Sequence, residues 1–290
     1  MGKEAKFIYL ENRKNHYIKP LLRLLLAGLL SLGCMLSFSQ TTIFSAVTGA
    51  WNEGTTWVGG TIPAPGDNAV IRTGHTVSLA TGSGETIHSL LIMSGGVLDA
   101  RNKPMAVTGS LIVNGTYTSD DISAKSLNFS GDSIGGSGTF AINDDSEALD
   151  VASDAIIIPS ANLQIFGNIN IRNNVTITNE GRIEINGDIT GQNATGSVWT
   201  QGSNSRLSIE GELLADGVLN ASAPGNSVTY FNQILQDVKP PASLTYYDLV
   251  ISGALTKNLQ ADLYVDNDLL ISSAILAGTN YDIYLKGDWS

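Results

Sequence analysis

Residues 163–187, LQIFGNINIRNNVTITNEGRIEING, decide the fold. They contain four short runs of β-favouring residues, separated by Gly and Asn, which favour turns. Apolar and polar side chains alternate in Ile169–Ile171, Val175–Ile177 and Ile183–Ile185. Such alternation is typical of a strand with one buried face and one face in water. This stretch therefore predicts several short strands in succession.

An apolar-x-apolar-x-Gly phrase recurs along the chain and gives these strands a period. The phrase ends at Gly115, Gly167, Gly187 and Gly211, and the last three glycines recur at an interval in the low twenties. Gly95 and Gly115 are separated by the same interval as Gly167 and Gly187. One rung of three short strands and three turns takes roughly twenty residues, and each rung buries its inward side chains only against its neighbours. The period therefore predicts an all-β fold, a right-handed parallel β-helix or β-solenoid.

The same kind of strand recurs over the rest of the chain, and no helical period follows Ile43. Other such runs are Ala69–Ile71, Thr76–Leu79, Ser89–Ile92, Ser110–Val113 and Arg206–Ile209. Gly and Asn suit left-handed turns at the corners, and we expect stacked Asn side chains to hydrogen-bond from rung to rung. A pair of β-sandwiches is the alternative, since it also has short strands and frequent turns. Irregular spacing over residues 120–154 keeps this alternative open.

Residues 228–290 are richer in aromatic residues and contain three further strand phrases. The phrases centre on Leu249, Val265 and Ile283, which follow one another more closely than the earlier glycines do. We expect solenoid rungs of slightly different size here, after the rungs of residues 89–227. A solenoid that ended on an apolar rung would expose that rung's core side chains at an open end. We therefore also expect the chain to be the front part of a longer protein.

The chain of 290 residues is acidic, rich in glycine and poor in charge. It has 16 basic and 27 acidic residues, a net charge of −11, 31 glycines and only 15 % charged residues. The acid excess argues against a nucleic-acid-binding protein, and the low charge argues against a coiled coil. The single cysteine excludes a disulfide framework and a multi-thiolate metal site, and the three histidines leave little for a histidine-based metal centre.

Residues 1–40 have the order of a secretory signal peptide. Six basic residues come first, an apolar run covers Leu24–Leu36, and Ser37 and Ser39 place small residues at a cleavage site. The apolar run is too short for a spanning helix, so we predict a secreted or cell-surface protein that meets a membrane only through this signal. A short membrane anchor is one alternative, and a bacterial lipoprotein modified at Cys34 is another. Cleavage would remove six basic residues, two acidic residues and the only cysteine, so the mature chain would be more acidic than the whole one.

The sharpest motif is WNEGTTWVGGTIPAPGDNAVI, residues 51–71. We expect residues 41–88 to form an N-terminal cap, because two indoles can cover the apolar core that the first rung of a solenoid exposes. Asp67 is expected to accept backbone N–H bonds in its turn. The structural residues of this cap would be Trp51, Trp57, Gly59, Gly60, Pro63, Gly66 and Asp67. The alternative is a binding platform on which Trp51 and Trp57 stack against sugar rings.

This phrase resembles the start of the G-eight domain, an extracellular β-rich module named for its eight glycines. The matching positions are Trp51, Trp57, Gly59, Gly60, Pro63, Gly66, Asp67, Val70, Ile71, Gly74, Thr76 and Val77. The resemblance covers residues 48–80 and implies a module that is often followed by parallel β-helix repeats. Leu249–Gly253 and Asp268–Ser272 are similar to strand repeats in large secreted adhesins of Bacteroidetes-type bacteria, which often use type nine secretion. Together these resemblances imply an adhesin-like surface protein.

Few residues are candidates for a catalytic or metal-binding site. Asp144, Asp145 and Glu147 lie in a loop-like stretch and are weak candidates for a Ca²⁺ site, but they lack the spacing of a calcium-binding loop. Other acids and two histidines are expected to be solvated or structural: Asp120, Asp121, Asp266, Asp268, His75 and His88. We therefore expect no catalytic residues, no metal site and no cofactor, with Ca²⁺ as the one open alternative.

Three functions follow from this pattern. A non-catalytic structural or adhesive module of the cell surface fits best, with extracellular glycans or surface proteins as partners and no nucleic acid. A glycan-binding or polysaccharide-cleaving β-helix, a lyase or hydrolase, is the alternative. The third is a scaffold within a larger multidomain enzyme.

Overall fold

The computed structural model describes residues 40–79, 84–101, 103–119, 127–142, 147–278 and 280–290. The predicted signal peptide with Cys34 lies outside the described residues, as do Asp120, Asp121, Asp144 and Asp145. Glu147 is described by its backbone alone. Gln40–Ser290 forms one compact unit.

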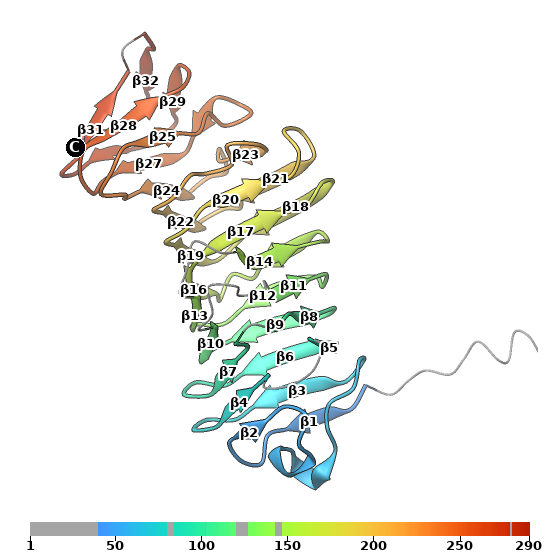
Figure 1. Ribbon diagram of the computed structural model, residues 1–290. Helices are drawn as coiled ribbons and strands as arrows, with labels where there is room; N and C mark the ends of the chain where they lie inside the picture. Colours follow the sequence, from blue (N-terminus) through green and yellow to red (C-terminus); the bar gives the residue numbers. More distant parts are fainter. Residues whose placement is uncertain (1–39, 80–83, 102, 120–126, 143–146, 279) are drawn as a thin grey trace, which may run out of the picture. The chain divides into compact units, whose positions relative to one another are not determined.

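Three parallel sheets dominate this unit (Figure 1). Sheet 1 has the order β1 (Thr42–Phe44), β3 (Asn68–Ile71), β6 (Ser89–Ile92), β9 (Ser110–Val113), β12 (Ser133–Gly135), β15 (Ala155–Ile157), β18 (Val175–Asn179), β21 (Ser197–Gln201) and β23 (Val218–Asn220). Sheet 2 has the order β2 (Gly49–Ala50), β4 (Thr76–Ser78), β7 (Val97–Asp99), β10 (Thr116–Ser119), β13 (Thr139–Ile142), β16 (Asn162–Phe166), β19 (Arg182–Ile185), β22 (Arg206–Ile209), β24 (Ser227–Tyr230), β27 (Asp248–Ile251) and β30 (Leu269–Ile271). Sheet 3 has the order β20 (Ile189–Gly191), β17 (Asn168–Ile171), β14 (Glu147–Val151), β11 (Leu127–Phe129), β8 (Met105–Val107) and β5 (Glu85–Ile87).

Two smaller parallel sheets follow near the C-terminus. Sheet 4 contains β25 (Gln236–Val238), β28 (Thr256–Leu259) and β31 (Ile275–Ala277). Sheet 5 contains β26 (Thr245–Tyr246), β29 (Leu263–Val265) and β32 (Ile283–Leu285). The only helical segments among the described residues are two 3-10 turns, η1 (Gly54–Thr56) and η2 (Val58–Gly60). The prediction of an all-β parallel solenoid is confirmed, and the alternative of two β-sandwiches is wrong.

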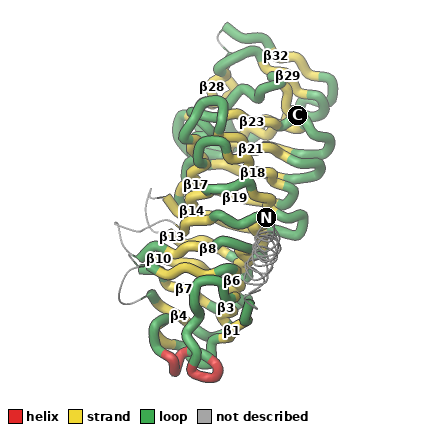
Figure 2. The backbone as a smooth tube through the Cα atoms, turned by 90° about the vertical axis from the view of Figure 1, so that its right-hand side faces the viewer, coloured by secondary structure: helices red, strands yellow, loops and turns green. Residues whose placement is uncertain are grey.

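Each rung takes one strand from each of the three main sheets in turn. In residues 163–187 the rung β17–β18–β19 follows β16, and β16 pairs with β19 one rung later. The register joins Leu163 to Ile183 and Ile165 to Ile185, so the period of the glycine phrase is the step between stacked rungs. In Figure 2 the rungs follow one another as stacked levels with loops at the corners.

The core lies between the sheets and is continuous along the unit. Every second residue of a strand points inward, as in β9, where Leu111 and Val113 are buried while Ser110 and Ile112 are partly exposed. Buried apolar side chains from Ile43 to Leu269 form one cluster. Because each inward side chain packs on equivalent positions of the neighbouring rungs, burial depends on stacking rather than on any single rung.

The predicted boundaries at residues 88 and 227 do not interrupt the sheets. β3 pairs with β6 across the first boundary, and β24 pairs with both β22 and β27 around the second. Single parallel bridges, Ile189 to Leu213 and Ala221 to Tyr246, continue the stacking beyond the last strands of sheets 3 and 1. Parallel stacking thus continues into residues 228–290.

The predicted spacing of these last rungs is wrong in detail. Leu249 pairs with Leu269, one full rung later, whereas Val265 belongs to sheet 5 and pairs with Leu285. The three phrases look alike because alternating strands of any sheet share one pattern. The pattern shows which residues face inward, but it does not show to which sheet a strand belongs.

Candidate functional site

The two tryptophans of the entry motif pack against each other inside the core. Trp51 and Trp57 are 1 % and 2 % exposed, and their rings meet edge to face with centroids 4.8 Å apart. Trp57 Nε1 donates a hydrogen bond to the backbone oxygen of Trp51 at 2.7 Å. Both follow β2, which is the edge strand of sheet 2. Neither indole presents a face to solvent.

Three glycines of the motif lie in left-handed turns, and Asp67 bonds to backbone N–H groups. Gly59, Gly60 and Gly66 adopt φ values of 76°, 75° and 102°, a left-handed region that favours glycine. Asp67 accepts N–H bonds from Ala64 at 3.0 Å and from Thr41 at 3.3 Å, as predicted. Pro63 is buried. The Asp67 carboxylate therefore ties its own turn to the residue that precedes β1.

Aspartates at the corners connect one rung to the next. In each case a carboxylate Oδ1 accepts the backbone N–H of a residue one rung later. The pairs are Asp154 with Thr176, Asp188 with Glu212, Asp248 with Asp268, Asp262 with Asp282, and Asp268 with Asp288, at 2.6–3.1 Å. Asp266 instead pairs with Lys286 at 2.6 Å. Five of the described aspartates thus join successive rungs.

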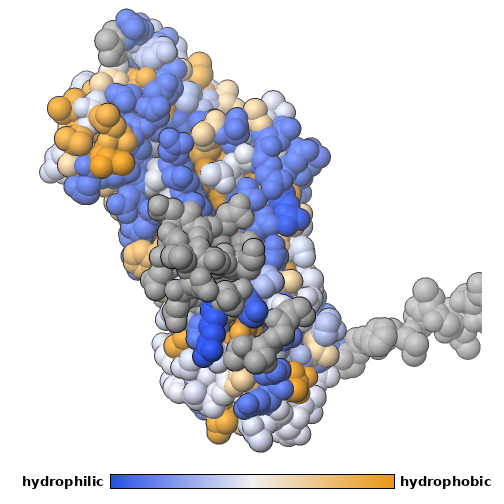
Figure 3. All heavy atoms as spheres, viewed as in Figure 1, coloured by the Kyte–Doolittle hydropathy of each residue, from blue (hydrophilic) through white to orange (hydrophobic). Residues whose placement is uncertain are grey.

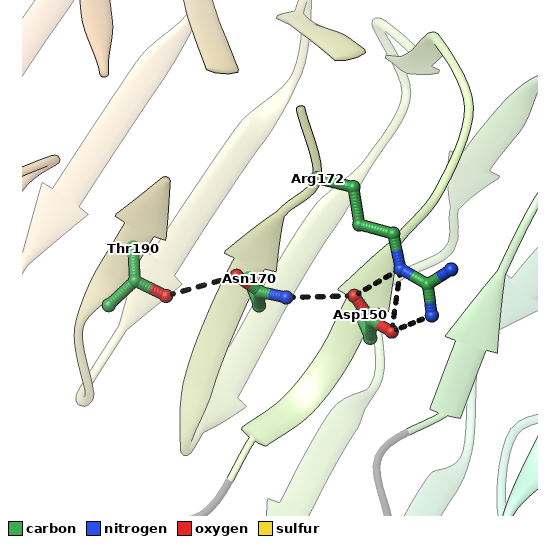
Figure 4. A network of polar contacts seen from close by, with 4 residues as sticks. All are labelled: Asp150, Asn170, Arg172 and Thr190. Carbon is green, nitrogen blue, oxygen red and sulfur yellow. Dashed lines mark hydrogen bonds and ion pairs between the residues drawn. The ribbon is translucent and has the colours of Figure 1, made fainter. Parts of the chain in front are cut away.

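A polar network with two buried members, Asp150 and Asn170, links neighbouring strands of sheet 3 (Figure 4). Asp150 and Asn170 are each 6 % exposed and are joined by a 2.9 Å bond from Asn170 Nδ2 to Asp150 Oδ1. Arg172 binds the same carboxylate through Nε at 3.1 Å and Nη2 at 2.5 Å. Thr190 Oγ1 lies 3.5 Å from Asn170 Oδ1. Asn side chains do bond across rungs, as predicted, and here they bond to an acid.

The histidines lie apart and in different surroundings. His75 Nδ1 lies 2.7 Å from Ser45 Oγ, which is buried and also accepts the N–H of Arg72 at 2.9 Å. His88 lies at the corner between β5 and β6, with Nδ1 3.5 Å from Thr108 Oγ1. Within the described residues, no three His, Cys, Asp or Glu side chains are placed to share a metal ion.

An open groove of about 560 Å³ runs over the corners between sheet 3 and sheet 1. We name it the serine groove. Its lining comes from four successive rungs: His88 and Ser89; Thr108, Gly109 and Ser110; Ser130, Gly131 and Asp132; Ser153 and Asp154. No motif in the sequence pointed to it, because these groups lie a full rung apart along the chain and resemble ordinary turn residues. Only the register of the rungs shows that these residues recur at one corner.

A second, smaller pocket of about 370 Å³ lies where sheet 4 begins. Its lining includes Glu212, Asp237 and Gln260 around Lys239. Burial lowers the pKa of the Lys239 ammonium, and the nearby Asp216 carboxylate partly opposes this. Lys239 Nζ lies 3.4 Å from the backbone oxygen of Ala215. One lysine and two carboxylates thus line the same pocket.

Apolar residues gather on the surface over β25, β28 and β31, as Figure 3 shows. Ile234, Leu235, Leu255 and Ile275 are 56–63 % exposed there. Beneath them Lys257 is fully buried, and its Nζ donates to the backbone oxygens of Asn232, Ile234 and Ala254 at 2.8–3.2 Å. All three ammonium protons are therefore satisfied by main-chain acceptors.

In the part of the chain that the structure describes, no helix has the length and apolar character to span a membrane. No family model, curated protein or solved structure matches this chain. The resemblance to the G-eight domain and to adhesin repeats accordingly remains a prediction.

Proposed function

We propose that this chain is a secreted or cell-surface β-solenoid module with a structural or adhesive, non-catalytic role. The observation that carries the proposal is the use of its acids: corner carboxylates accept N–H bonds between rungs instead of converging on one point. A fold whose rungs are joined in this way at several corners supplies a long, repetitive surface. The signal-like order of residues 1–40 supports an extracellular place.

The export part is tested by producing the full chain and a variant that lacks residues 1–40, each with a C-terminal tag. We expect the full chain outside the cell or on its surface and the shortened one inside. The adhesive part is tested by coating beads with the exported chain and counting beads retained on glycan-bearing and protein-bearing surfaces. Retention of the full chain in the cytoplasm, or beads that bind no better than albumin-coated beads, would contradict the proposal.

A polysaccharide-cleaving function is the second candidate, and the Lys239 pocket favours it. Burial lowers the pKa of Lys239, which favours its acting as a proton acceptor, and the two carboxylates of the same lining can accept hydrogen bonds from sugar hydroxyls. Release of reducing ends from polysaccharides by the wild type, lost in Lys239→Met and retained in Lys286→Met, would support this function over the non-catalytic one. Lys286 is an exposed lysine outside the pocket.

A further inference from the structure

The serine groove has a hydroxyl-bearing residue on each of its four rungs. Ser110 pairs with Ser133 across neighbouring strands of sheet 1, and Ser89 Oγ accepts the N–H of Ser110 at 3.1 Å. Parallel strands lie about 4.8 Å apart, so four rungs extend about 14 Å. Each of the four rungs thus presents at least one hydroxyl group to the groove, which suits a ligand that is itself an extended chain.

Two glycines belong to the lining, and a side chain at either would collide with the preceding rung. A Cβ on Gly109 would lie 2.6 Å from His88 Nε2 and 2.8 Å from Ser89 Oγ. A Cβ on Gly131 would lie 1.6 Å from the backbone oxygen of Gly109. Neither residue has a left-handed φ, so the requirement for glycine here is one of space. The ligand would lie against backbone at these two rungs.

The groove retains unused hydrogen-bonding capacity. Asp132 and Asp154 each engage Oδ1, with Ser133 Oγ at 2.9 Å and the N–H of Thr176 at 2.8 Å. Among the described residues, no partner bonds to the Oδ2 atom of either carboxylate or to the hydroxyl groups of Ser110 and Ser130. A sugar hydroxyl group both donates and accepts hydrogen bonds, so it can bond to these carboxylate oxygens and to these serine hydroxyls.

The charge of the groove selects the ligand class. The described lining has two carboxylates and no lysine or arginine. Arg172, one rung beyond, is held by Asp150. An anionic polymer would bring its charge close to Asp132 and Asp154 without a compensating cation, which disfavours it. An uncharged polyhydroxylated chain meets no such repulsion.

We propose that the serine groove binds an uncharged oligosaccharide chain laid across successive rungs. The inference rests on the proposed adhesive function and names its ligand. Hydroxyl groups of the sugar donate to the free carboxylate oxygens and accept from the serine hydroxyls. The sugar rings lie where Gly109 and Gly131 present no side chain.

The test uses the exported full chain and measures binding to dextran, mannan and β-glucan as neutral polymers, and to hyaluronate and polygalacturonate as anionic ones. We expect the wild type to bind at least one neutral polymer and to bind it more tightly than either anionic one. Ser130→Trp fills the groove at an exposed turn and should weaken this binding at least tenfold. Ser203→Trp, an exposed serine at another turn, is the matched control and should change it less than twofold.

A charge reversal tests selectivity. Asp132→Lys should weaken binding of the neutral polymer and strengthen binding of the anionic ones. Glu180→Lys makes the same change of charge at an exposed position outside the groove and should do neither. A wild type that binds none of the five polymers, or prefers the anionic ones, overturns the inference, and so does a Ser130→Trp variant that binds like wild type.

The two proposals fail in different ways. If the chain is exported and adheres, and Ser130→Trp adheres equally well, the groove inference is wrong and the proposed function stands. If the wild type stays inside the cell, the proposed function fails whatever the purified chain binds.

Discussion

The indole pair at Trp51 and Trp57 is the residue-scale feature on which the predicted cap depends. Trp57→Ala should lower the free energy of unfolding by about 3 kcal/mol or more, because it empties a large buried site and removes the bond to the Trp51 carbonyl. Trp289→Ala, which alters a tryptophan that is 63 % exposed, should have little effect. Urea denaturation measures both. A Trp57→Ala variant that is as stable as wild type but has lost glycan binding would favour the aromatic platform instead.

Leu255 shows the opposite case, a residue in an unfavourable backbone conformation. Its φ of 57° lies in the left-handed region, and its side chain is 56 % exposed. Leu255→Asn should stabilise the chain by roughly 0.5–1 kcal/mol, since Asn tolerates this conformation better than Leu does. Leu235→Asn is the control, because Leu235 is similarly exposed without a positive φ. Equal effects of both substitutions on the thermal midpoint would contradict the backbone explanation.

At the scale of elements, Asp150 of β14 pairs with Arg172, the residue that follows β17 in sheet 3. Arg172→Ala should destabilise the chain by about 2 kcal/mol, because it leaves a buried carboxylate with only an amide partner. Lys286→Ala breaks an exposed ion pair with Asp266 and should cost less than about 1 kcal/mol. Denaturant midpoints compare the two variants. If the two losses are equal, burial does not set the strength of the Asp150 network.

For the unit of residues 40–290 as a whole, buried tyrosines predict a loss of stability in alkali. Burial raises the pKa of Tyr117, Tyr230 and Tyr246, and the hydroxyl groups of the last two lie 2.9 Å apart. The folded chain therefore keeps protons that the unfolded chain releases above about pH 10. Stability from these groups is complete below that pH and falls as the pH rises further.

Denaturation curves at increasing pH, with the phenolate absorbance as a second signal, measure this effect. The double variant Tyr230→Phe, Tyr246→Phe should show a shallower decline than the wild type. Tyr247→Phe, which alters a half-buried tyrosine of the same segment, should leave the slope unchanged. Phenolate absorbance that develops fully while the chain remains folded would contradict the burial of these groups.

Strands, their period and their inward faces could be read from residues 163–187, because alternation and corner glycines act within one rung. The residues at the corners, however, are not all there for the expected conformational reason. Asn174 and Asn204 do occupy left-handed corners, but Gly187 does not. It is glycine because a Cβ would lie 2.5 Å from the carbonyl carbon of Gly167, one rung below.

Local pattern was sufficient for the all-β solenoid because hydrophobic periodicity is a property of neighbouring residues. It could not assign Val265 to sheet 5, nor place Ser89, Ser110 and Ser130 on one groove with Asp132 and Asp154. Those relations join residues a full rung apart in the sequence, and they exist only once rungs stack in a definite register. The polar surface of this protein therefore depends on how the rungs stack, whereas each strand is determined by the residues of its own rung.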